Sequence, residues 1–245
     1  MTPMRQQIRS GLRQARDFVI GQPDVPVMTR LIRGDARAET FFAAVEFVNY
    51  ERVAGDILEF GVFTGVSLAL LAQGHSFDPK GMVRRVAGFD SFEGLPPSAE
   101  QHARWVAGDC ATNHGSHPLA ATGTRVTPQI TRDLFEACGL AAPELHTGLF
   151  DRTVPAAVPS VYPAVAIAHI DCDLYESTCT ALEAIEPALQ DGTVLLFDDW
   201  FHYRGNPHKG EARAFHEFLA SHPQWEAAHY RSYATFCNAF ILSRR

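Results

Sequence analysis

The chain has 245 residues, of which 46% are hydrophobic and 20% are charged, and its formal net charge is -7. This length suits one large α/β domain or two small ones, and the composition is ordinary for a globular protein. The negative charge argues against nucleic acid as a partner. No apolar run approaches the roughly 20 residues of a membrane span, so no membrane association is expected.

Localisation is predicted from the cysteines and from the first residues. The five cysteines are odd in number and show no CxxC spacing, which indicates reduced thiols rather than a disulfide framework or a zinc site. The first 20 residues lack the apolar stretch and cleavage site of a signal peptide. We therefore expect a cytoplasmic protein.

The first 50 residues predict helices. A basic amphipathic helix is expected over 1–20, a proline-containing break over 21–26 and a second helix over 38–53. We interpret 1–50 as a helical segment that covers the site or joins two copies into a homodimer, and 51–245 as the main domain. A plain solvated helix face is the alternative for the basic residues.

Beyond residue 55, predicted strands and helices alternate. Strands are expected at 56–63, 84–90, 143–150, 161–171 and 192–199, helices at 64–74, 127–139, 175–190 and 209–222, loops with one short helix at 95–128, and a terminal hairpin at 225–245. Continuous apolar strands alternating with helices predict a parallel sheet covered on both faces. The expected fold is α/β and Rossmann-like, with seven mostly parallel strands and a terminal antiparallel hairpin.

Four aspartates follow the two most apolar predicted strands: Asp171 and Asp173 after one, Asp198 and Asp199 after the other. Such carboxylates repel one another and are costly to desolvate, so a positive group is expected among them. Three of them could ligate Mg²⁺, Mn²⁺ or Ca²⁺. The alternative is helix capping, to which Asp173 is best placed because it precedes a predicted helix.

A glycine-containing turn joins the first strand to its helix. Gly61 and Gly65 stand in G-x-x-x-G spacing, which differs from the G-x-G-x-x-G of dinucleotide folds. Glu59 is ill suited to a pyrophosphate but suits a cationic cofactor such as S-adenosylmethionine. Phe63 and Ser67 belong to the same candidate cofactor site, for which a tight strand–helix turn is the alternative.

The second and third strand ends supply further cofactor candidates. A carboxylate at Asp90 can accept both hydroxyls of a ribose, and Ser91 and Phe92 could flank an adenosine. Turn capping is the alternative for Asp90. Gly148 and Phe150 are candidates at the following strand end.

The expected chemistry is activation of a hydroxyl. A metal lowers the pKa of a bound oxygen, and a free aspartate can then take the proton. Two vicinal hydroxyls could chelate the metal, which favours sugars or catechols as acceptors. His202 and His208 could contact substrate or act as base, with a solvated loop as the alternative, whereas His169 lies on an apolar strand and is expected in the core.

Five segments of the chain resemble the macrocin O-methyltransferase family, which contains metal-dependent sugar O-methyltransferases of antibiotic biosynthesis. The segments are EFGVFTG, DSFEGLP, GLFDRTVP, IDCDLYEST and FDDW. The resemblance implies a class I methyltransferase fold over 51–245 that uses S-adenosylmethionine. It also implies Mg²⁺ on Asp171, Asp198 and Asp199, with Asp173 as general base.

The leading hypothesis is therefore a Mg²⁺-dependent O-methyltransferase acting on a hydroxyl of a sugar or glycosylated natural product. A catechol or phenol O-methyltransferase is the nearest alternative. An NAD-dependent oxidoreductase and a non-catalytic cofactor-binding module are further alternatives, against which the glycine spacing and the aspartates argue.

Overall fold

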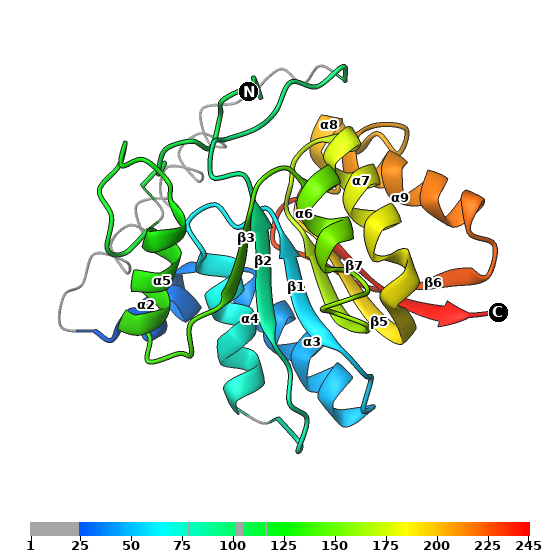
Figure 1. Ribbon diagram of the computed structural model, residues 1–245, viewed down its shortest axis with the longest axis horizontal. Coiled ribbons are helices and arrows are strands. Elements are labelled where there is room, and N and C mark those ends of the chain that lie inside the picture. The colour runs from blue at the N-terminus through cyan, green and yellow to red at the C-terminus, as the bar shows by residue number, and fades with distance from the viewer. Residues whose placement is uncertain (1–24, 78, 101–104, 116) are drawn as a thin grey trace, which may run out of the picture.

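The computed structural model describes residues 25–77, 79–100, 105–115 and 117–245 (Figure 1). Within them, five strands alternate with helices before a terminal hairpin. The helices are α2 (Val27–Gly34), α3 (Ala38–Tyr50), α4 (Val66–Phe77), α5 (Pro128–Ala137), α6 (Phe150–Ala157), α7 (Tyr175–Ile185), the 3-10 turn η1 (Glu186–Ala188), α8 (His202–Gly205) and α9 (Gly210–Ser221). The strands are β1 (Asp56–Phe60), β2 (Val86–Asp90), β3 (Glu144–Thr147), β4 (Val165–Ile170), β5 (Leu189–Phe197), β6 (Trp225–Tyr233) and β7 (Cys237–Arg244).

The strands form one seven-stranded sheet in the order β3-β2-β1-β4-β5-β7-β6. The first five pair in parallel, and β7 pairs antiparallel with both β5 and β6. This confirms the predicted Rossmann-like sheet and its terminal hairpin. Strand order reverses between β1 and β4, so a crevice is expected at the carboxyl ends of those two strands.

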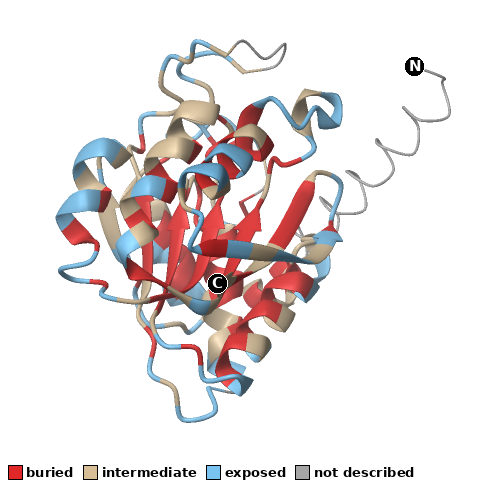
Figure 2. Cartoon of the chain, turned by 90° about the vertical axis from the view of Figure 1, so that its right-hand side faces the viewer, coloured by how far each residue is buried: buried red, intermediate tan, exposed pale blue. Residues whose placement is uncertain are grey.

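Both faces of the sheet are buried because its strands alternate between two cores. On β5, Val194 and Leu196 belong to one core, and Leu195 and Phe197 belong to the other. Helices α2 to α5 cover the first face and α6, α7 and α9 the second, which leaves the sheet as the buried centre in Figure 2. Continuous apolar strands are the sequence signature of such a sheet.

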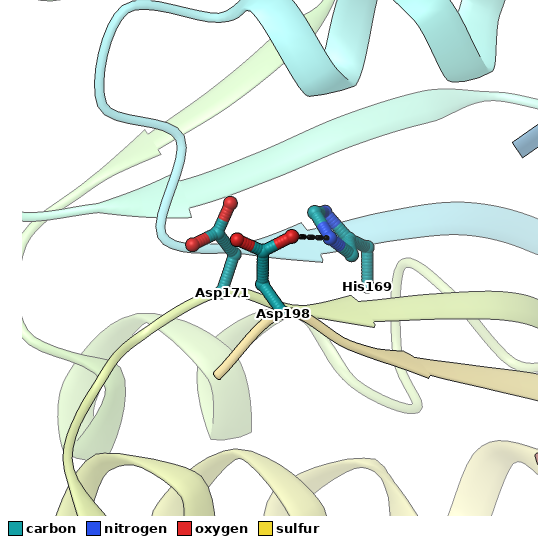
Figure 3. A group of neighbouring side chains, drawn as sticks. All are labelled: His169, Asp171 and Asp198. Atoms are coloured by element: carbon teal, nitrogen blue, oxygen red, sulfur yellow. Dashed lines mark ion pairs between the residues drawn. The ribbon is translucent and has the colours of Figure 1, made fainter. Parts of the chain in front are cut away.

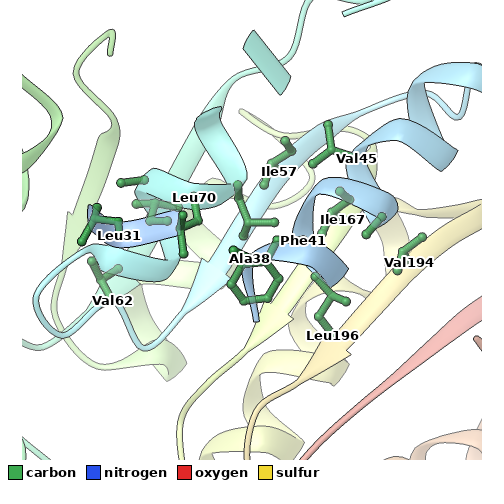
Figure 4. Packing of buried hydrophobic residues seen from close by; sticks show 14 of the residues in the cluster. Leu31, Ala38, Phe41, Val45, Ile57, Val62, Leu70, Ile167, Val194 and Leu196 are labelled. Atoms are coloured by element: carbon green, nitrogen blue, oxygen red, sulfur yellow. The ribbon is translucent and has the colours of Figure 1, made fainter. Parts of the chain in front are cut away.

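Helix α3 packs against the sheet, and helix α2 packs against α3 and α4. Leu31 of α2 and Phe41 of α3 are almost fully buried, in the same cluster as Ile57 of β1 and Leu70 of α4 (Figure 4). The sequence predicted α3 but not α2, which has only eight residues and is preceded by Pro26. The predicted helix over 1–20 lies outside the described residues.

Details of the strand ends and loops differ from the sequence prediction. The strand expected over 143–150 ends at Thr147, and Phe150 begins helix α6 instead. In the described part of 95–128, no helix begins before α5, and Thr112 and Arg125 form an isolated antiparallel bridge.

No helix among the described residues is long and apolar enough to cross a membrane.

Candidate active site

A cavity of about 1090 Å³ lies at the carboxyl ends of the parallel strands. It has room for a cofactor together with part of an acceptor. Of the predicted site residues, eleven line its wall: Gly61, Phe63, Ser67, Asp90, Ser91, Gly148, Phe150, Asp171, Asp173, Asp198 and Asp199. Three others, Glu59, Gly65 and Phe92, are not among the lining residues. The cavity thus joins two regions. We call the region around Asp90 the cofactor end, after the role predicted for it from the sequence, and the region around the four aspartates the acid end.

Asp90 organises the cofactor end through backbone hydrogen bonds. Its Oδ2 accepts from the N–H groups of Val62 and Phe63, each at 2.8 Å, and its Oδ1 accepts from Phe92 at 2.7 Å. The carboxylate therefore ties the β1–α4 turn to the end of β2. A carboxylate has about four acceptor positions, so capacity remains for a ligand hydroxyl.

The glycines of the β1–α4 turn are required by close backbone approach. Gly61 has a φ of +93°, and a side chain there would collide with the backbone carbonyl of Asp171. Gly65 has a φ of +84° and lies against the side chain of Thr131. Gly61 therefore lets β1 and β4 meet at the cavity, whereas Gly65 packs the turn against α5.

Ser91 and Phe92 occupy different places in the turn after β2. The Ser91 hydroxyl accepts from the N–H of Glu93 at 3.1 Å and contacts the carbonyl of Gly94 at 3.3 Å. Phe92 is 5% exposed and belongs to the core cluster under α2 to α5. Only Ser91 of this pair faces the cavity.

Glu59 is fully buried and pairs with His169, its direct partner across β1 and β4. The His169 Nδ1 lies 2.8 Å from Glu59 Oε1, and the His169 Nε2 lies 3.7 Å from Asp198 Oδ1. Burial alone would lower the pKa of His169, but the carboxylates of Asp198 and Glu59 raise it to about 10. His169 is thus in the core as predicted, and it links Glu59 to the acid end.

Asp171 and Asp198 lie side by side just past β4 and β5 (Figure 3). The guanidinium of Arg37, which precedes α3, bridges them: its Nη1 is 3.1 Å from Asp171 Oδ2 and 2.9 Å from Asp198 Oδ1. Arg37 is itself held by Asp35 through Nε at 3.0 Å and Nη2 at 2.9 Å. A positive group thus contacts the cluster, as its charge requires, and it is contributed by the N-terminal segment.

Asp199 lies deeper and is surrounded by acidic groups. It is 7% exposed, its backbone N–H donates to the buried Glu211 at 2.9 Å, and its Oδ1 lies 2.6 Å from His202 Nδ1. Its carboxyl also faces that of Asp173, whose φ is +62°. A non-glycine residue in this conformation is strained, and such strain concentrates at functional sites.

The carboxyl groups of the acid end fall into two groups, one with a lowered pKa and one with raised pKa values. Burial by itself would raise the pKa of Asp198, but Arg37 and His169 hold it well below its usual range. Burial and the neighbouring carboxylates raise the pKa of Asp171, Asp173, Asp199 and Glu211 well above theirs. Arg37 and His169 therefore stabilise one charged carboxylate fully and leave the others short of positive charge.

The loop after Asp199 carries His202 and His208, the two histidines predicted as substrate contacts or as base, and their surroundings differ. The His202 ring lies 4.6 Å from the ring of Trp105 and 4.2 Å from that of Phe236, measured between centroids. His208 is exposed, and its N–H donates to the side chain of Asn206 at 2.9 Å. His202 therefore borders the acid end through Asp199, whereas His208 lies on the solvated loop.

Three residues of the acid end were not among the sequence candidates: Arg37, Glu211 and Cys237, whose Sγ lies 3.3 Å from Asp198 Oδ1. Arg37 and Cys237 lie 161 and 39 residues from Asp198, so no local motif joins them to it. Glu59 and His169 did carry a signal, because each is an ionisable residue inside an apolar strand.

A sequence profile described as macrocin-O-methyltransferase matches residues 5–223. The 8-demethyl-8-(2,3-dimethoxy-alpha-L-rhamnosyl)-tetracenomycin-C 4'-O-methyltransferase of Streptomyces olivaceus is 31% identical over 206 residues, which cover 81% of this chain and 72% of that protein.

Two solved structures share the fold. The calicheamicin methyltransferase CalS11 superposes with a TM-score of 0.70 at 22% identity, over 98% of this chain and 93% of that one. An O-methyltransferase from Bacillus cereus in complex with SAH has a TM-score of 0.55 at 17% identity, over 89% of this chain and 92% of that one. The profile match spans most of the chain, so the protein belongs to the macrocin-O-methyltransferase family and is an O-methyltransferase.

Proposed function

We propose that this protein transfers the methyl group of S-adenosylmethionine to a hydroxyl of a sugar or glycosylated natural product, with the help of Mg²⁺. One observation supports the proposal most: a single cavity joins the carboxylate of Asp90 to an acidic cluster short of positive charge. The first feature suits a nucleoside, and the second suits a hard cation with an oxygen acceptor.

At the cofactor end, we assign one ribose hydroxyl to Asp90. Three backbone N–H groups already fix its carboxylate, so the ligand meets an acceptor that needs no further ordering. Gly61, Phe63, Ser67 and Ser91 line the wall around it. Glu59 does not, and we assign it to the buried pair with His169 instead.

At the acid end, Mg²⁺ is assigned to Asp171, Asp198 and Asp199, with Mn²⁺ or Ca²⁺ as substitutes. The residues present fit a hard cation, because the donors are carboxylate oxygens. Among the described residues, Oδ2 of Asp199 is buried without a hydrogen-bond partner. When bound, the cation would lower the pKa of the acceptor hydroxyl.

Asp173 is proposed as the general base. Its left-handed backbone conformation places it in the cavity wall, beside Asp199. Burial and Asp199 raise its pKa, and a carboxylate with a raised pKa is a stronger base. The strain at this position is consistent with that role.

The acceptor is proposed from the relatives. The Streptomyces olivaceus enzyme methylates a rhamnosyl group on an aromatic natural product, as its name states. The proposed cover formed by 1–50 is supported by Arg33, Asp35 and Arg37, which contribute to the cavity wall.

The test combines cofactor binding and methyl transfer. Calorimetry with S-adenosylhomocysteine should show one binding site. Radiolabelled S-adenosylmethionine should then label an alkyl or aryl α-L-rhamnoside, or another glycoside in a panel, and should not label catechol. Absence of S-adenosylhomocysteine binding would overturn the cofactor assignment, and labelling of catechols alone would move the acceptor to aromatic hydroxyls.

A further inference from the structure

Arg37 differs from the other groups of the acid end because it is anchored at one side and bridging at the other. Its Nε and Nη2 contact Asp35, two residues away, while its Nη1 contacts Asp171 and Asp198, 134 and 161 residues away. Its side chain is 19% exposed, and its guanidinium lies 5.6 Å from the centre of the Phe41 ring. The arginine is therefore held in place before it contacts the cluster.

The charges around Arg37 show what it does for the cluster. Asp171, Asp173, Asp198, Asp199 and Glu211 bring five carboxyl groups together. Among the described residues, the ion pairs to these carboxyl groups come from Arg37, His169 and His202 only. Of these three, Arg37 alone is charged at every ordinary pH, so it is the permanent counter-cation of the cluster.

We propose that Arg37 and a divalent cation oppose each other at Asp171 and Asp198, so that Arg37 sets the metal affinity of the acid end. This inference rests on the proposed metal site. Both cations draw on the same two carboxylates, and two positive groups at such short range repel. The Asp35 contacts give Arg37 a partner that it keeps when Nη1 withdraws, so metal entry need not leave a buried guanidinium unpaired.

The opposition between Arg37 and the divalent cation also affects the wall of the cavity. Asp35, Ala36 and Arg37 connect α2 to α3, and they line the cavity together with Gly34 at the end of α2. A change in the position of Arg37 therefore acts on the segment proposed to cover the site. A purely orienting role would have the opposite consequence for metal binding, because loss of an orienting group weakens a site.

The experiment compares the Mn²⁺ affinities of Arg37→Met and the wild type, from the electron paramagnetic resonance signal of free Mn²⁺. Loss of the guanidinium should tighten Mn²⁺ binding on the order of tenfold or more, and Arg37→Lys should fall between the two. Arg231→Met removes a positive charge outside the cavity and should leave the Mn²⁺ affinity unchanged. S-adenosylhomocysteine titration of each variant checks that the cofactor end is intact.

Failure of the Arg37 inference and failure of the proposed function give different results. Unchanged or weaker Mn²⁺ binding by Arg37→Met, with S-adenosylhomocysteine binding intact, would overturn the inference and leave the proposed function standing. If Arg37→Met does not fold, the same comparison is made with Arg37→Lys. If the wild type binds no Mn²⁺ at millimolar concentration, binding by Arg37→Met would support the inference, and binding by neither would overturn it together with the metal assignment. Absence of S-adenosylhomocysteine binding by the wild type would instead overturn the cofactor assignment.

Discussion

The two ends of the cavity satisfy their carboxylates in different ways. Asp90 receives three hydrogen bonds from backbone N–H groups, all within 28 residues of it. Asp171 and Asp198 instead depend on the side chain of Arg37, from more than 130 residues away, and Asp199 keeps a buried oxygen without a partner among the described residues. The cofactor end is thus complete on its own, whereas the acid end remains short of positive charge.

This difference supports the proposal that one end of the cavity recognises the cofactor and the other carries out the reaction. Backbone donors are fixed by the fold and hold Asp90 ready to accept from a ligand. Side-chain cations can move, and the excess of carboxylates over cations favours a further positive ion. Variants at one end should therefore leave ligand binding at the other end unchanged.

The largest effect is expected for Asp198→Asn. Removing this charge should lower methyl transfer on the order of a thousandfold or more, because a proposed cation ligand is lost. S-adenosylhomocysteine affinity, measured by calorimetry, should be unchanged. Asp191→Asn, at an exposed position on β5, is the control and should keep full activity. Substantial turnover by Asp198→Asn would refute the role assigned to the acid end.

A large loss of stability is expected for Glu59→Ala. Removing one partner of the fully buried pair with His169 should lower the free energy of unfolding by about 3–5 kcal/mol, measured by chemical denaturation. Glu39→Ala, whose side chain is 93% exposed, should change it by less than about 0.5 kcal/mol. Loss of S-adenosylhomocysteine affinity without loss of stability would instead favour Glu59 as a cofactor contact.

A smaller effect is expected for Asp90→Asn, which tests the cofactor end. The variant should bind S-adenosylhomocysteine about ten- to a hundredfold more weakly, because hydrogen bonds to a charged acceptor are lost. Its Mn²⁺ affinity should match that of the wild type. Equal S-adenosylhomocysteine affinity would show that Asp90 only caps the turn.

The smallest effect is a dependence of stability on pH. Burial and neighbouring carboxylates raise the pKa of Asp173 and Asp199, so the folded protein keeps protons that the unfolded chain has lost. Stability without metal should therefore fall as pH rises above about 4. His169, with a folded pKa of about 10 against 6.5, adds stability below pH 6.5 that is lost as pH rises through about 10.

Thermal denaturation between pH 5 and 9, with and without Mn²⁺, measures the slope of stability against pH. Added Mn²⁺ should flatten the slope, because it stabilises the charged carboxylates, and Asp199→Asn should flatten it without metal. A melting temperature that rises with pH over this range in the metal-free protein would contradict the predicted direction.

The strands that carry the site were predictable because their patterns are local. Apolar runs ending in Asp90, Asp171 and Asp198 predicted the strand ends, and the structure places all three in one cavity wall. Helix α2 was missed because eight residues carry little periodicity, and because it packs against α3 and α4 through contacts that no local pattern of the sequence specifies.

Contacts between distant residues were not predictable. Glu59 was expected to contact a cationic cofactor, but its partner is His169 on the neighbouring strand, a register that no local pattern specifies. Arg37 precedes a helix and had no motif of its own. It contacts Asp198 only because α3 packs beside β4 and β5.

The most direct test of the central claim is a titration of the wild type, Asp198→Asn and Asp90→Asn with Mn²⁺, monitored by the resonance signal of the free ion. Two ends with separate tasks predict one bound ion per chain in the wild type and in Asp90→Asn, and none in Asp198→Asn at the same concentration. Absence of a bound ion from both the wild type and Arg37→Met, or a bound ion that survives Asp198→Asn, would contradict the assignment of the acid end to a divalent cation.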